Sequence, residues 1–142
     1  MSLLAKAIQS ILPNDFTKVA HLLKQLISKL LEDGFSAGEF EYMFIPEYIG
    51  KNGLADFHTS LNALKHITQY TSCEFAIRPF VILNKERSME FMLECLLHEH
   101  PNVRRFESEG CRSRLPWAIS LPEFKNDATL ILPILENLKA DT

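Results

Sequence analysis

The chain has 142 residues, of which 46% are hydrophobic and 23% charged, and its formal net charge is −3. These values allow one domain with a sizeable core and are ordinary for a soluble globular protein. We expect no membrane span and no signal peptide, because no apolar run has the required length or layout. A slightly acidic chain is also a poor candidate for binding nucleic acid over its whole surface.

Two helices are predicted at the start of the chain. Leucine and isoleucine recur at helical spacing in residues 3–12 and about 15–33. Asn14 or Asp15 is placed to cap the second helix, and Gly34 is placed to end it. The residues expected to face inward from the second helix are Leu22, Leu23, Leu26, Leu30 and Leu31.

Turn signals separate the next two predicted helices. The spacing of residues 36–39 fits a capping box before a helix that Pro46 should kink or split. Residues 51–53 form the clearest turn signal in the chain. Asp56 can cap a helix that runs to about Gln69. The side chains that this helix should bury are Phe57, Leu61, Leu64 and Ile67.

The segment Cys73–Leu83 is almost entirely apolar apart from Glu74 and Arg78, so it predicts an enclosed helix with one polar edge. Pro79 should bend this helix. The remaining predicted helices are Met89–His98 capped by Ser88, an arginine-rich helix opened by Asn102 or Pro101, and Ala128–Lys139 capped by Asp127. Strand-like alternation is absent from the sequence, so the predicted fold class is all-α.

The predicted helices form pairs. Phe57–Gln69 pairs with Cys73–Leu83, and Met89–His98 pairs with Val103–Arg112, so that Glu74 and Glu109 are 35 residues apart. This separation is near the period of helical-solenoid repeats, and stacked pairs would place both glutamates in one concave groove. Alternatively, the separation arises by chance.

The stretch from Val103 to Trp117 carries the strongest functional signal. As a helix, it places Val103, Phe106 and Gly110 on an apolar face. The opposite face carries Arg104, Arg105, Ser108, Glu109 and Arg112. Leu115-Pro116 should end the regular structure just before Trp117.

This stretch also has a purely structural interpretation. Glu109 is spaced for solvated helix-surface pairs with Arg105 and Arg112, which are worth a few tenths of a kcal/mol each. Trp117 could pack as a plug against the next helix. Basic charge is nevertheless local, since residues 101–118 carry four arginines against two glutamates, whereas residues 1–60 carry five lysines against seven acids. Any DNA contact should therefore be local as well.

Three motifs in this sequence resemble those of the AlkC branch of the AlkC/AlkD family of DNA alkylation-repair glycosylases. The motifs are Glu74–Phe80, the stretch Val103–Ala118 with Ser108–Gly110 and Arg114–Trp117 at its centre, and Leu132–Leu135 with Leu138, Lys139 and Asp141. The resemblance runs in order from about Cys73 to Thr142 and is looser before that. It implies HEAT-like helix pairs stacked as a right-handed superhelix, that is, an α-α solenoid. We expect one domain, 1–142, with N-terminal helices in 1–55 and HEAT-like repeats in 56–142, the last of them incomplete.

The resemblance also implies an activity and a site. The activity is hydrolysis of the N-glycosidic bond of an alkylated purine such as 3-methyladenine in double-stranded DNA, without flipping the lesion into a deep pocket. By resemblance, Glu74 and Glu109 match the site carboxylates of the family and Trp117 matches its site aromatic. The candidates for phosphate contacts are Arg78, Arg104, Arg105, Arg112 and Arg114, with Arg112 and Arg114 favoured because they lie nearest Trp117 in sequence.

Two departures from the family pattern bear on activity. Ser113 stands where a proline is expected, and the family's later helix with a catalytic aspartate does not occur within the 142 residues. We expect either a truncated product or a repeat array that ends unpaired, with activity impaired or lost. An uncovered face with Leu132, Leu135 and Leu138 would favour self-association. The rival hypothesis is a non-catalytic helical-repeat module that binds DNA or a protein partner.

The remaining residues indicate neither a metal nor a cofactor. Cys73, Cys95 and Cys111 are odd in number and far apart, so we expect reduced thiols in a cytoplasmic protein. The five histidines have no metal-binding spacing, and there is no glycine-rich phosphate loop or nucleophile motif. No metal and no cofactor are therefore predicted.

Overall fold

A computed structural model of the chain describes residues 2–37 and 40–140. Within these ranges the regular elements are helices and there is no strand, which confirms the all-α prediction. The elements are α1 (Ser2–Gln9), α2 (Phe16–Glu32), the 3-10 helix η1 (Phe40–Met43), α3 (Phe44–Asn52), α4 (Phe57–Ile67), α5 (Arg78–Leu83), α6 (Lys85–Cys95), α7 (Pro101–Gly110), α8 (Glu123–Asn126) and α9 (Leu132–Leu138). No helix among the described residues combines the length and the apolar character needed to cross a bilayer.

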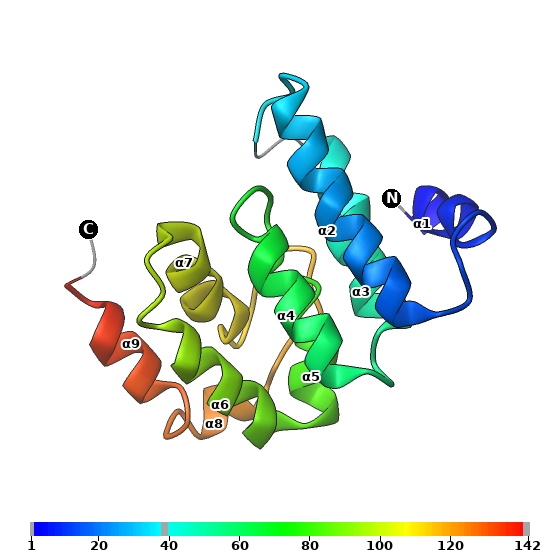
Figure 1. Cartoon of the computed structure of the whole chain (residues 1–142). Helices are drawn as coiled ribbons and strands as arrows, with labels where there is room; N and C mark the ends of the chain where they lie inside the picture. The colour runs from blue at the N-terminus through cyan, green and yellow to red at the C-terminus, as the bar shows by residue number, and fades with distance from the viewer. Residues whose placement is uncertain (1, 38–39, 141–142) are drawn as a thin grey trace.

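The helices stack on one another along the chain, and the predicted pair of α6 with α7 is observed, whereas α4 packs on α2 and α3 rather than mainly on α5. In Figure 1, α2 and α4 lie side by side with α3 behind them, and the chain then passes through α6 and α7 to α9. The packing contacts follow this order, since α2 packs on α4, α3 on α5, α5 on α6, and α7 on both α6 and α9. The buried apolar residues form one connected cluster from Val19 to Ile134. The proposed division at residue 55 stays a prediction, because α3 contacts both α4 and α5 across it.

Several helix ends follow the predicted caps. Asp15 accepts a hydrogen bond from the Lys18 backbone N–H at 3.3 Å at the start of α2. Asp56 does the same for the Thr59 N–H at 3.3 Å at the start of α4. Gly34 follows α2 with a φ of 94°, a conformation that side chains with a Cβ disfavour. The capping box predicted at 36–39 lies partly outside the described residues.

The inward stripe predicted for α2 is confirmed at Leu23 and, as a partly buried residue, at Leu30, but is wrong at Leu22 and Leu26. The buried residues are Val19, Ala20, Leu23 and Ile27, whereas Leu22 and Leu26 are exposed. Because α2 packs mainly on α4 and α3, only one narrow face of the helix is covered. The leucine-rich sequence offers two adjacent apolar stripes, and contact with α4 selects one of them.

The helix predicted at Cys73–Leu83 is also wrong at its start. Helix α5 begins at Arg78, with Pro79 in its first turn, and Glu74 to Ala76 form a turn before it. Proline lacks a backbone N–H and clashes with the carbonyl four residues earlier, so it is tolerated in the first turn of a helix rather than in its interior. Pro79 therefore starts α5 instead of bending a longer helix, and Glu74 lies in a turn.

Two other predicted caps have different roles. Asn84 caps α6 by accepting from the Arg87 N–H at 3.1 Å, while Ser88 is buried within the helix and donates to the Asn84 carbonyl at 2.8 Å. Asp127 accepts from the Thr129 N–H at 2.9 Å in a turn, and α9 begins only at Leu132. At α6 the reason is that Asn84 already accepts a backbone N–H of the first turn. At α9 the N-cap residue is Ile131, which makes no side-chain cap.

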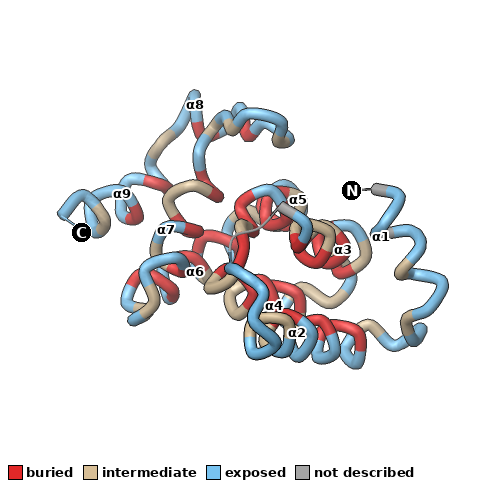
Figure 2. The backbone as a smooth tube through the Cα atoms, turned by 90° about the horizontal axis from the view of Figure 1, so that it is seen from above, coloured by how far each residue is buried: buried red, intermediate tan, exposed pale blue. Residues whose placement is uncertain are grey.

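Burial is concentrated in the middle of the molecule. Figure 2 shows buried segments where α3, α4, α5 and α7 meet, whereas α1 and α8 are mostly exposed. On α9, Ile134 is buried while Leu132 and Leu135 are exposed. Self-association through that apolar face stays a prediction.

Candidate functional site: the hollows beside Glu74 and Trp117

Helix α7 has the apolar face predicted from its sequence. Val103, Phe106 and Gly110 are buried, and α7 packs against α6 and α9. At Gly110 a Cβ atom would lie 2.8 Å from Cε of Met92 on α6. Glycine at this position therefore allows the two helices to approach closely, directly after Glu109.

Glu109 lies at the edge of this packed face. Its side chain is 22% exposed, and its Oε2 atom is 3.1 Å from Nη1 of Arg112. This is the i, i+3 helix-surface pair of the structural interpretation. The pair does not exclude a functional carboxylate, because Arg112 is the more exposed partner and a phosphate could compete for it.

Glu74 occupies a different environment in the turn before α5. It is 7% exposed, and its Oε2 atom has no hydrogen-bond partner among the residues that the structure describes. Glu74 lines a small hollow of about 180 Å³ together with Arg105 of α7. A buried carboxylate oxygen without a partner is costly, so the position of Glu74 calls for an explanation beyond packing.

Trp117 projects fully into solvent. Its side chain is 100% exposed, which overturns the alternative that it plugs a gap against the next helix. Its backbone φ is 65°, in the left-handed region that a bulky residue seldom adopts. Trp117 borders a larger hollow of about 650 Å³ that is lined mostly by apolar side chains. Members of that lining include Pro46, Phe75, Ala76, Pro79 and Ile119.

The two hollows share one lining residue, Ser72. Glu74 and Arg105 line the smaller hollow, and Trp117 lines the larger one. Glu109 lies one helical turn after Arg105 on α7 and lines neither of these two hollows.

Arg78 does not have the predicted position for a phosphate contact. It is 0% exposed, and its guanidinium donates to three backbone carbonyls, those of Gly110, Ser113 and Ile119. A side chain held in this way cannot reach a phosphate without breaking these bonds. We therefore reassign Arg78 from DNA contact to the interior of the fold.

The other four arginines differ among themselves. Nη1 of Arg104 donates to the carbonyls of His98 and Glu99, at 2.9 Å each, and so holds the segment between α6 and α7. Arg105, Arg112 and Arg114 are exposed. These three remain candidates for phosphate contacts, and Arg105 is the one that shares a hollow with Glu74.

The burial of Glu107 was not predicted from the sequence. It is fully buried, and within the described residues neither carboxyl oxygen has a hydrogen-bond partner. Burial raises the pKa of Glu107 to about 9, although the Cys95 thiol and the charge of Lys65 act in the opposite direction. Its spacing of four from Val103 and three from Gly110 was a signal that it shares the inward face.

The three cysteines are free and buried, as expected for reduced thiols. Burial raises the pKa of Cys95 and Cys111 to about 12, and the negative charge of Glu107 adds to the effect. Such thiols are poor nucleophiles at neutral pH. In the part of the chain that the structure describes, no three His, Cys, Asp or Glu residues are grouped to hold a metal ion.

Comparison with known proteins gives a consistent result. No family model matches the chain. The uncharacterized protein YhaZ of Bacillus subtilis is 43% identical over 99 residues, which is 70% of this chain and 28% of that protein. The solved structure of Pseudomonas fluorescens alkylpurine DNA glycosylase AlkC, bound to DNA containing an abasic site analog, matches with a TM-score of 0.87 and 35% identity.

That structural match covers 97% of this chain and 37% of the AlkC chain, so the chain spans well under half the length of either relative. The likeness nevertheless extends over nearly all described helices, and its identity exceeds what a shared fold alone would require. By sequence motifs and by structure, this chain is an AlkC-like member of the AlkC/AlkD DNA alkylation-repair glycosylase family.

Proposed function

We propose that this chain carries part of the site of a DNA glycosylase that removes alkylated purines such as 3-methyladenine from double-stranded DNA. The observation that carries the proposal is the fully exposed indole of Trp117 at an apolar hollow, which shares the lining residue Ser72 with the smaller hollow of Glu74 and Arg105. The likeness to a glycosylase bound to abasic DNA supports the same reaction class.

The chemistry matches these groups. An alkylated purine is a cation and leaves readily, so the protein needs to recognise positive charge and stabilise the developing oxocarbenium ion of the sugar. The face of Trp117 can attract the cationic base by a cation–π interaction. Glu74 can stabilise the sugar cation and accept a proton from water as the water oxygen bonds to C1′ and the base departs with the electron pair of the N-glycosidic bond.

The availability of the Glu109 carboxylate depends on its ion pair with Arg112. Nη1 of the guanidinium lies 3.1 Å from Oε2 of Glu109. A DNA phosphate that draws Arg112 away would release the Glu109 carboxylate. Arg105 and Arg114 are also exposed and would add positive charge for a local DNA contact despite the net charge of −3.

The test is release of free methylated base from alkylated duplex DNA by the 142-residue chain. Glu74→Gln and Glu109→Gln should each lower the rate about 100-fold or more, the scale for losing one electrostatic group in a site. Glu90→Gln, the same chemical change at an exposed position of α6, is the matched control and should leave the rate unchanged.

The outcomes separate the two functional hypotheses. Equal release by all variants would remove both carboxylates from the proposed reaction. No release by the wild-type chain, together with binding to a duplex with an abasic-site analog and a helical circular dichroism spectrum, would instead identify a binding-only helical-repeat module.

A further inference from the structure

The loop that follows α7 is held by a single buried side chain from another helix. Nη1 of Arg78 donates to the Gly110 carbonyl at 3.3 Å and Nη2 donates to the Ser113 carbonyl at 3.4 Å. Nε donates to the carbonyl of Ile119. One guanidinium therefore binds the loop at its beginning and again after Trp117.

These contacts join segments that are far apart in sequence. Arg78 is separated from its three partners by 32, 35 and 41 residues. It is also the first residue of α5 and comes directly after the turn that contains Glu74. Arg78 thus connects the turn with the unpartnered carboxylate to the loop with the exposed indole.

Trp117 needs such an anchor because its own side chain provides none. The indole is completely exposed, so its own packing does not fix the loop. Its left-handed φ of 65° is strained for a bulky residue and persists only where the surrounding backbone is held. The start of the loop is also tied to α7, by the Cys111 and Arg112 N–H groups, but around Trp117 the backbone bonds are Ala118 N–H to Leu115 O at 3.2 Å and Leu121 N–H to Ser113 O at 2.8 Å.

We propose that Arg78 is a positioning residue that fixes the loop of residues 110–119 and thereby presents Trp117 at the apolar hollow lined by Phe75 and Ala76. Only the consequence for DNA rests on the proposed function. Positioning of this kind lowers the ordering cost of binding, because the aromatic contact is already in place when DNA arrives.

The first experiment reads the loop directly. Trp117 is the one tryptophan in the sequence, so fluorescence anisotropy reports on this loop alone. Arg78→Met removes all three hydrogen bonds and should lower the anisotropy. Arg78→Lys keeps the positive charge but cannot donate in three directions from a planar group, so it should lower the anisotropy less. Arg104→Met is the matched control, since it also removes a guanidinium from backbone carbonyls but in the segment before α7.

Trypsin provides a second reading of the same loop. The bonds after Arg112 and Arg114 lie between the anchored positions, so cleavage there should accelerate about tenfold or more in Arg78→Met if local opening limits cleavage. The Arg104→Met control should be cut at these sites as slowly as wild type. Wild-type anisotropy and cleavage in folded Arg78→Met would overturn the proposal, and Arg78→Lys decides if Arg78→Met does not fold.

A measurement on the wild-type chain tests the proposal even if neither variant folds. The ¹⁵N relaxation of the Trp117 backbone N–H should show order similar to that of α7. A backbone that moves freely on the ps–ns timescale would overturn the proposal.

The DNA arm uses a duplex with an abasic-site analog. Arg78→Lys should weaken binding in the wild-type background by about tenfold, the scale of one lost base–aromatic contact, and should have no effect in the Trp117→Ala background. Equal weakening in both backgrounds would show that Arg78 does not act through Trp117. If no variant binds DNA, the proposed function fails while anisotropy and proteolysis still decide the role of Arg78.

Discussion

Helix α7 and the loop that follows it use their aromatic residues in opposite ways. Phe106 is 0% exposed and belongs to the core between α6 and α9, whereas Trp117, eleven residues later, is 100% exposed. The same short stretch therefore contains a residue that holds the helices together and one that no neighbouring side chain covers.

Residues that stabilise the fold and residues that remain accessible therefore lie on different segments of the molecule. The buried face of α7 fixes the scaffold, and the turn with Glu74 and the loop with Trp117 carry the exposed or unpartnered groups on that scaffold. Functional groups on loops held by rigid elements are a common arrangement. Substitutions on the two sides should thus change different measurements.

The largest expected effect is on stability at Phe106. Phe106→Ala should lower the free energy of unfolding by about 3–5 kcal/mol, because it removes buried apolar surface and leaves a cavity. Trp117→Ala should change it by less than about 0.5 kcal/mol, as is usual for an exposed side chain. Urea unfolding followed by circular dichroism measures both, and comparable losses would break the contrast between helix and loop.

The second effect comes from Glu107 and depends on pH. Its folded pKa of about 9 lies above the usual value of 4.5 for a glutamate, so the folded state retains a proton that the unfolded state loses. Its contribution to stability is fully present below pH 4.5 and is lost as the pH rises towards 9. Glu107→Gln cannot titrate and should not show this loss.

The expected size follows from the free energy of one pKa unit, about 1.4 kcal/mol. Between pH 5 and pH 7 the unfolding free energy of Glu107→Gln should therefore gain about 3 kcal/mol relative to that of wild type. Urea titrations at several pH values measure the difference. A constant difference across this range would show that Glu107 is ionised in the folded protein, and Glu90→Gln controls for the substitution itself.

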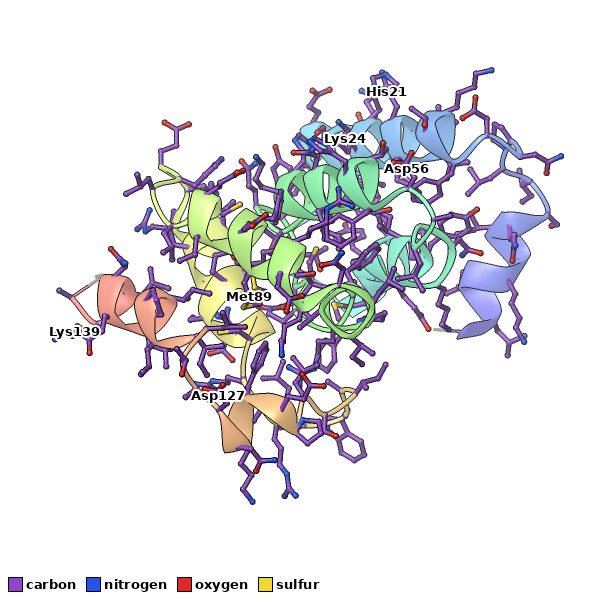
Figure 3. The ribbon with its side chains drawn as sticks, turned by 90° about the horizontal axis from the view of Figure 1, so that it is seen from below. His21, Lys24, Asp56, Met89, Asp127 and Lys139 are labelled. Atoms are coloured by element: carbon purple, nitrogen blue, oxygen red, sulfur yellow. The ribbon has the colours of Figure 1, made fainter. Side chains whose placement is uncertain are left out.

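The third effect concerns the exposed arginines of the loop. Changing Arg112 and Arg114 together to Ala should reduce the slope of log affinity for duplex DNA against log salt by about 2, if each contacts one phosphate. The matched control is Lys24→Ala with Lys29→Ala on α2. Figure 3 shows Lys24 and His21 on α2, where they and Lys29 line a hollow with His66 of α4. An unchanged slope in the arginine variant would remove both arginines as phosphate ligands.

The smallest effect is on the backbone of Trp117. A left-handed conformation costs an L-residue roughly 1–2 kcal/mol, whereas glycine adopts it freely but loses more entropy on folding. Trp117→Gly should therefore be as stable as Trp117→Ala or more stable, by up to about 1 kcal/mol. A glycine variant that is clearly less stable than the alanine variant would argue against the left-handed φ of 65°.

The features of this protein that could be predicted from the sequence are local ones: helix type, helix faces and helix caps. Helical periodicity predicted the all-α class and the inward face of α7, and the caps at Asp15 and Asp56 were predicted from residue type and position. These features depend on groups within one or two helical turns of each other, so they can be read along the chain. The motifs also predicted the AlkC-like family.

The tertiary structure was needed to distinguish residues that look equivalent in the sequence, such as buried and exposed arginines. Five arginines fitted a phosphate contact, but Arg78 donates to carbonyls 32 to 41 residues away and is buried, while Arg112 and Arg114 stay exposed. Packing against α4 chose the inward stripe of α2, and the position of α5 left Glu74 in a turn. Local sequence fixes which residues can share a helix face, whereas burial and pairing depend on neighbours that the fold brings from distant parts of the chain.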